Sequence, residues 1–157
     1  VGSEMCIRDR FDFNYINLGF SGSAKGEQAM MDYIAGLDMS MFVYDYDHNA
    51  PDPAHLAATH YKGYQTVRAS HPDIPIIMAS RPTYDHPREN AAERRDVIAA
   101  SYERARAEGD GNVYFVDGAK VFSTFFADGC TVDGTHPTDL GFYRMAEAFG
   151  EIIARIF

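Results

Sequence analysis

Apolar positions follow two alternating patterns along the chain, one typical of strands and one typical of helices. Continuous apolar runs of strand length fall at residues 13–18, 41–46, 74–79 and 112–116. Apolar residues recur every three to four positions, the spacing of one helix face, at residues 30–37, 53–71, 90–108 and 138–156. Because strands of a parallel sheet covered on both faces are apolar throughout, the alternation predicts a doubly wound α/β domain.

The first ten residues do not fit this pattern. Residues 1–10 show no clear period and lack the apolar stretch of a signal peptide. They resemble translated sequencing-adapter read-through, so we expect a non-native extension at 1–10 and a single domain over 11–157. The alternative is an ordinary polar N-terminal arm.

Composition narrows the classes of protein. A chain of 157 residues has the length of one domain, and 10 Tyr plus 11 Phe exclude intrinsic disorder. The 14 basic and 23 acidic side chains give a net charge of −9, which argues against nucleic acid and anionic membranes as partners. No apolar run reaches the roughly 18 residues of a membrane span. Cys6 and Cys130 form neither a disulfide framework nor a metal motif.

The loop before the last predicted helix carries an acid and a base. Asp133 stands three residues before His136, so its carboxylate can turn onto the imidazole Nδ1 and leave Nε2 as a general base. Pro137 suits the beginning of a helix. The alternative is that Asp133 and Thr135 only shape a turn and Thr138 caps the helix.

A second loop, residues 17–23, is rich in glycine and is expected to join a strand to a helix. Its backbone N–H groups could then hold an oxyanion or a phosphate. Ser21 suggests the nucleophile of a Gly-x-Ser-x-Gly turn, but Ser23 stands where the last glycine belongs. A plain glycine-rich turn is the alternative.

A third loop follows the predicted strand 41–46. Asp45, Asp47 and His48 are candidate metal ligands, but strand alternation would send His48 to the opposite face from the carboxylates. We therefore expect no metal. Asn49 could donate its side-chain amide to a developing negative charge. His60 lies on an apolar helix face and is expected to be a hydrogen-bonded core residue.

Together the three loops resemble the SGNH (GDSL-type) hydrolases, a family named for Ser, Gly, Asn and His sequence blocks. The resemblance spans residues 11–157, and its most specific part runs from Asp133 to Phe142. It implies a flavodoxin-like three-layer α/β/α fold, Asp133 and His136 as triad members, and Gly22 and Asn49 as oxyanion donors. The family's commoner Gly-x-Asn-Asp is not matched around Asn49.

The family's first block, which carries the nucleophilic serine after the first strand, has no counterpart before Gly22. The resemblance therefore implies a fragment that lacks its nucleophile and the first strand, which is central in the family's sheet. It also implies hydrolysis of small acyl esters, such as acetylated carbohydrates, by the complete protein, without cofactor or metal. A flavodoxin-type phosphate-binding module and an esterase that uses Ser21 remain the alternatives.

Overall fold

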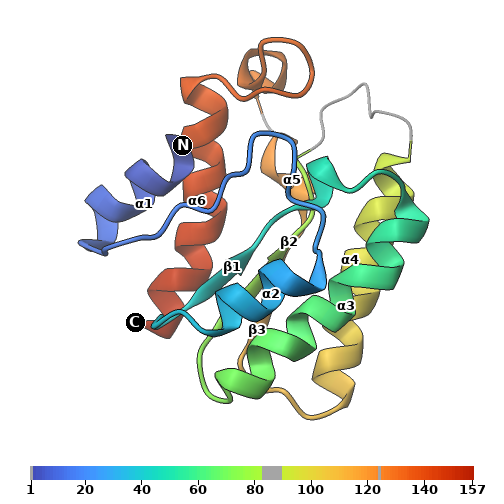
Figure 1. The fold of residues 1–157 in the computed structure, drawn as a ribbon. Coiled ribbons are helices and arrows are strands. Elements are labelled where there is room, and N and C mark those ends of the chain that lie inside the picture. The colour runs from blue at the N-terminus through green and yellow to red at the C-terminus, as the bar shows by residue number, and fades with distance from the viewer. Residues whose placement is uncertain (1, 83–89, 124) are drawn as a thin grey trace.

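The computed structural model describes residues 2–82, 90–123 and 125–157. These residues form a parallel three-stranded sheet in the order β1-β2-β3, with helices on both faces (Figure 1). The strands are β1 (Phe42–Tyr44), β2 (Ile76–Ala79) and β3 (Val113–Val116). The α-helices are α1 (Gly2–Phe11), α2 (Gln28–Ala35), α3 (Pro53–Ser70), α4 (Ala91–Ala107), α5 (Gly118–Val121) and α6 (Asp139–Ile156). Two short 3₁₀ turns complete the elements: η1 (Asp47–Asn49) and η2 (Ala127–Cys130).

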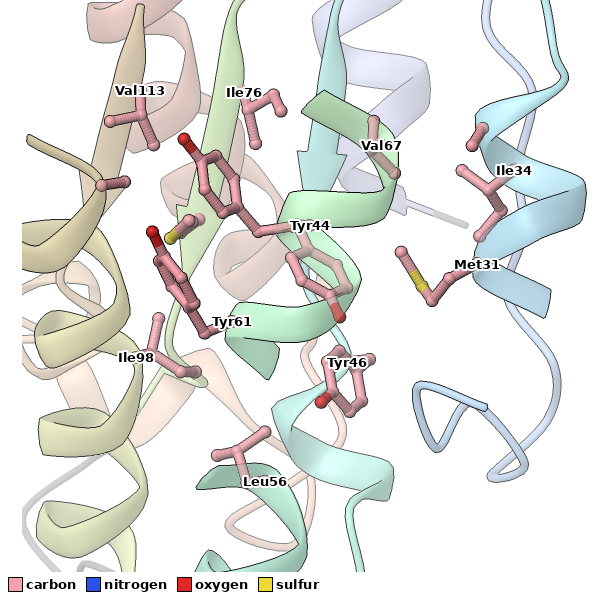
Figure 2. Close-up of a cluster of buried hydrophobic side chains, with 14 of the residues drawn as sticks. Met31, Ile34, Tyr44, Tyr46, Leu56, Tyr61, Val67, Ile76, Ile98 and Val113 are labelled. Carbon is pink, nitrogen blue, oxygen red and sulfur yellow. The ribbon is translucent and has the colours of Figure 1, made fainter. Parts of the chain in front are cut away.

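The central strand β2 divides the core into two halves. All four of its side chains are buried, and alternation sends Ile76 and Met78 to one face and Ile77 and Ala79 to the other. Helices α2, α3 and α4 cover the first face, where Figure 2 shows their apolar side chains gathered against the strands. Helix α6 covers the second face with Met145, Phe149 and Ile153. This is the three-layer α/β/α arrangement that the sequence predicts.

The predicted strand at residues 13–18 is wrong. These residues are irregular in the structure, and they link α1, beside α6, to α2 without joining the sheet (Figure 1). Apolar composition alone does not make a strand, because a strand also needs a neighbour for its backbone hydrogen bonds. Tyr15 and Ile16 are accordingly exposed. The other three predicted strands and the four predicted helices are present, with ends shifted by a few residues.

Residues 2–11 form a helix that packs on α6. A Cβ at Gly150 in α6 would lie 3.3 Å from the Phe11 ring, and Ile7 joins the same apolar cluster. That residues 1–10 are a non-native extension stays a prediction. None of the helices within the described residues has the length and apolar character needed to cross a bilayer.

A cavity of about 760 Å³ lies along the outer edge of β1. Within the described residues β1 pairs with β2 alone, so its other edge carries no sheet hydrogen bonds. The cavity is lined by residues from the 12–20 segment, from α2, from β1 and from the end of α6. The lining is mostly apolar, with Leu18, Met30, Phe42 and Ile153 as examples. The structure therefore leaves an open strand position at this edge.

Asp45 is one of five acidic residues that line this cavity. Asp45 is an exposed residue, so solvent reaches its side chain at this cavity. Desolvation by the surrounding protein, followed by the nearby charges of Asp47 and Glu4, raises the pKa of Asp45 to about 7. Ionisation of Asp45 near neutral pH therefore lowers the stability of the folded protein.

His60 on α3 is buried to 1% exposure and stacks on Tyr44, with ring centroids 4.6 Å apart. Neither ring nitrogen has a hydrogen-bond partner within the described residues. The expectation of a hydrogen-bonded core histidine is therefore half right, since the ring is core but its nitrogens are not satisfied. Burial lowers the pKa of His60 to about 3, so the ring is neutral.

Replacement of Asp45 by Asn is expected to stabilise the protein at high pH. Because the folded-state pKa of Asp45 exceeds the unfolded value, its favourable contribution is present at low pH and is lost as pH rises through about 7. Asp45→Asn should raise Tm at about pH 8 and leave it nearly unchanged at about pH 4. Thermal unfolding at both pH values measures this, with the exposed Asp73→Asn as control. An equal shift at both pH values would contradict it.

The buried His60 is expected to make stability fall with acid. The unfolded chain takes up a proton below its ordinary pKa near 6.5, whereas the folded chain resists protonation down to about 3. Between about pH 7.5 and 5.5 this costs roughly 1.4 kcal/mol of unfolding free energy. Between these two pH values, His60→Phe should lose about 1.4 kcal/mol less unfolding free energy than the parent chain loses. Denaturant titrations at both pH values measure this difference. The same loss in both proteins would mean that His60 is protonated without penalty.

Candidate active site

The three loops predicted to carry chemistry lie toward the same end of the sheet (Figure 1). Because the strands are parallel, the segments after β1, β2 and β3 all leave the sheet at its carboxyl edge. In open α/β sheets this edge is the usual place for ligands.

Asp133 and His136 form a direct side-chain contact. His136 Nδ1 lies 2.7 Å from Asp133 Oδ2, while Asp133 Oδ1 accepts the backbone N–H groups of Thr135 and His136 at 2.9 Å each. These backbone hydrogen bonds, and then the imidazole, hold the pKa of Asp133 well below its usual range. An ionised carboxylate only accepts hydrogen bonds, so Nδ1 carries the proton and Nε2 is left as the basic nitrogen.

A small hairpin fixes this pair in place. Thr131 and Pro137 form an antiparallel bridge, and the backbone N–H of Val132 donates to the His136 carbonyl at 2.9 Å. Gly134, with φ +80°, provides the left-handed turn between them. The pair is open to solvent, since the His136 side chain is 78% exposed.

The same hairpin is anchored to the start of α6. Thr138 caps α6 by accepting the Gly141 N–H and donates its hydroxyl to the Gly129 carbonyl at 2.6 Å. A Cβ at position 141 would collide with the Cys130 carbonyl oxygen, so glycine is required there. The turn and cap that the sequence offers as an alternative are thus present together with the Asp133–His136 contact.

Gly22 and Asn49 lie side by side. The position of a Cβ on Gly22 would be 3.7 Å from Asn49 Oδ1, an ordinary van der Waals distance. Ser21 and Gly22 both have positive φ, and Ser23 N–H closes the turn onto the Phe20 carbonyl at 3.1 Å. The structure therefore brings together the two residues that sequence reasoning names as oxyanion donors.

The loop at 17–23 differs from its prediction in two respects. It follows no strand, and α2 begins only at Gln28, five residues after Ser23. The N–H groups of that loop are therefore not the N-terminal groups of a helix, and the helix dipole cannot help to bind a phosphate there. Ser21 is exposed within the turn.

The segment at 45–49 also departs from strand geometry. Strand β1 ends at Tyr44, and Asp47–Asn49 form the turn η1, so Asp45 and Asp47 do not share a strand face. Asp45 faces the cavity, whereas Asp47 is fully buried. Residues 2–82, 90–123 and 125–157 contain no group of three His, Cys, Asp or Glu side chains arranged for a metal ion.

Sequence reasoning missed two buried arginines near Asn49. Arg94, in the first turn of α4, is only 7% exposed and donates to the Asp47 carbonyl at 2.9 Å. The backbone N–H of Arg81, after β2, donates to the Asp47 carboxylate at 2.8 Å. A polar helix pattern gives no signal of which arginine points inward, because the acceptors come from other segments.

Comparison with known proteins places the fold in one family. The sequence model of the GDSL-like lipase/acylhydrolase family matches residues 3–154. A crystal structure described as a GDSL-like lipase from Bacteroides ovatus shares 32% identity with a TM-score of 0.82 over 97% of this chain. The chain spans 47% of the length of that protein. No curated protein sequence shows significant similarity.

Two more distant structures share the fold. The salicylyl-acyltransferase SsfX3 of a tetracycline biosynthetic pathway has 20% identity and a TM-score of 0.68, covering 85% of this chain and 42% of its own. A peptidoglycan O-acetylesterase has 16% identity and a TM-score of 0.63, covering 83% and 41% respectively. The family match over nearly the whole chain, together with the first structure, shows that this protein belongs to the GDSL-like lipase/acylhydrolase family.

Proposed function

We propose that the complete protein hydrolyses small acyl esters by a serine mechanism in which His136 is the general base and general acid and Asp133 orients its ring. The observation that carries the proposal is the 2.7 Å contact between Asp133 Oδ2 and His136 Nδ1. This contact orients the ring so that Nε2 faces away from Asp133, and the His136 side chain is 78% exposed, so a nucleophile and a substrate can reach it.

The reaction follows from this arrangement. Nε2 of His136 takes the hydroxyl proton while the serine oxygen attacks the acyl carbonyl carbon, and a tetrahedral intermediate forms. The same nitrogen then gives the proton to the leaving alcohol as the ester C–O bond breaks. A water molecule, deprotonated by His136, attacks the acyl-enzyme, and the serine leaves with the proton as the acid is released. Asp133 holds the ring and stabilises the imidazolium that forms.

Gly22 and Asn49 are proposed to stabilise the oxyanion of both tetrahedral intermediates. The Gly22 backbone N–H and the Asn49 side-chain amide are donors, and the 3.7 Å approach between the Gly22 Cβ position and Asn49 Oδ1 supports a shared site. Preorganised donors of this kind act where negative charge develops, so their effect falls mainly on kcat.

The nucleophilic serine is proposed to lie on a further strand at the free edge of β1. The unpaired edge, and the mostly apolar cavity of about 760 Å³ beside it, support this position. A parallel strand there would end at the same edge of the sheet as η1, which carries Asn49. Residues 11–157 would then be the part of the catalytic domain that holds the Asp133–His136 pair and two oxyanion donors.

Short acyl esters are the proposed substrate class, with O-acetylated carbohydrates as the first to test. The family includes lipases and acylhydrolases, and the fold is shared with a peptidoglycan O-acetylesterase. The net charge of −9 and the open Asp133–His136 pair favour a neutral small molecule over a nucleic acid or an anionic surface.

The chain of 157 residues is expected to be nearly inactive on short acyl esters. Without the serine, oxyanion donors and binding leave only about 10³–10⁴-fold catalysis over water. Assays with a chromogenic acetate ester and labelling with a fluorophosphonate probe measure this, with Ser21→Ala as the matched variant. Turnover or labelling that disappears in Ser21→Ala would make Ser21 the nucleophile and overturn the proposed strand serine.

In the complete protein, loss of the base is expected to be far more damaging than loss of one oxyanion donor. His136→Ala should nearly abolish turnover, and Asp133→Asn should lower kcat by about 10⁴ because the ring takes the wrong tautomer. Asn49→Ala should lower kcat by about 10²–10³. Steady-state kinetics, with and without a chelator, measure these effects.

The control for these kinetics is His71→Gln. His71 lies before β2, at the end of the sheet opposite to the candidate site. It hydrogen-bonds the Ala35 carbonyl through its side chain, and a Gln side chain can also donate to that carbonyl. It should retain parental kcat. Activity that the chelator removes, or that survives in His136→Ala, would replace the serine mechanism with a different one.

A further inference from the structure

The turn that carries Asn49 is enclosed by buried charged groups. Asp47, two residues before Asn49, is 0% exposed, and Arg94 from α4 is 7% exposed. Their charges approach closely, with Arg94 Nη1 3.6 Å from Asp47 Oδ1. The ester reaction proposed above does not use either side chain.

Arg94 binds the backbone on both sides of Asn49. Its Nη1 donates to the Asp47 carbonyl at 2.9 Å, and its Nη2 donates to the Pro51 carbonyl at 3.1 Å. One rigid guanidinium therefore spans the ends of a five-residue segment with Asn49 at its centre. A lysine has a single nitrogen and cannot fix two carbonyls in the same planar geometry.

The Asp47 carboxylate ties the same turn to the neighbouring strand. Its Oδ2 accepts the backbone N–H of Arg81, the second residue after β2, at 2.8 Å. The Asn49 N–H itself donates back to the Tyr46 carbonyl at 3.0 Å. Hydrogen bonds therefore fix the turn to α4, to the segment after β2 and to its own backbone.

Stability alone is a poor explanation for such a pair. Burying an ion pair costs desolvation that its attraction only partly offsets, and apolar replacements are often as stable. These two side chains instead fix backbone groups, since Arg94 donates to the carbonyls of Asp47 and Pro51 and the Asp47 carboxylate accepts the Arg81 N–H. A catalytic donor needs such a fixed geometry, because a shift of about 1 Å can cost 10²-fold in rate.

We propose that Arg94 and Asp47 are positioning residues that hold Asn49 in place as an oxyanion donor; its catalytic part rests on the proposed function. Arg94 fixes the two carbonyls that flank Asn49, and Asp47 compensates the buried charge while anchoring the turn to the end of β2.

The first experiment measures the turn itself, in the ¹⁵N-labelled 157-residue chain. Amide hydrogen exchange is followed at Asn49 and at Ile77, a buried residue of β2 that reports on the whole fold. In Arg94→Lys, exchange should accelerate about tenfold or more at Asn49 and less than about twofold at Ile77. The matched control is Arg95→Lys on the same helix, whose parent side chain binds Asp117 instead; both sites should stay within about twofold.

Two results would overturn the proposal. Equal acceleration at Asn49 and Ile77 would mean that Arg94 only supports the fold, and no change at Asn49 would mean that the turn holds without it. If Arg94→Lys does not fold, Asp47→Asn is measured in the same way, since Asn can still accept the Arg81 N–H while the charge is removed. For Asp47→Asn too, equal acceleration at Asn49 and Ile77, or no change at Asn49, would overturn the proposal.

The second experiment is a double-mutant cycle in the complete protein. Arg94→Lys should lower kcat about 10- to 100-fold with KM unchanged when Asn49 is present, and by less than about threefold in the Asn49→Ala background. Equal effects in both backgrounds would overturn the role through Asn49. A complete protein without esterase activity would instead refute the proposed function, while the exchange experiment would still decide whether the turn is clamped.

Discussion

The arrangement of this protein depends on one strand that has no contact with water. All four side chains of β2 are buried, and they alternate between two apolar clusters. Such a strand needs a helical layer on each side and a parallel neighbour at each edge, because neither its side chains nor its backbone can be left to solvent. The pairing of β2 with β1 and β3 then fixes the direction in which each following segment leaves the sheet.

Because all three strands run in the same direction, the segments that carry the candidate functional residues leave the sheet at one end. The turn η1 follows β1, Arg81 follows β2, and the segment that leads to Asp133 and His136 follows β3. No two of these segments are adjacent in sequence, yet the Asp47 carboxylate reaches the Arg81 N–H. The geometry of the Asp133–His136 pair is local by contrast, since one hairpin and one helix cap determine it.

Polar groups in the core and at its cavity divide into two kinds here. Asp47 and Arg94 are compensated, each by the other and by backbone groups, so they can fix the turn that carries Asn49. The His60 ring nitrogens have no hydrogen-bond partner among the described residues, and desolvation lowers the pKa of His60 and raises the pKa of Asp45. Asp45 lines the cavity at the free edge of β1. His60 lies on α3 in the helical layer, where its ring stacks on Tyr44 and Tyr46.

The sequence by itself determined the α/β class, three of the strands, the helices α2, α3, α4 and α6, and the Asp133–His136 contact. These depend on periodicity or on residues three positions apart, and short-range spacing is visible in a sequence. The tertiary structure decided the rest. Residues 13–18 have the composition of a strand, but strand formation depends on a partner that composition does not reveal. The inward turn of Arg94 and the approach of Gly22 to Asn49 each join segments far apart in the chain, so only packing could bring them together.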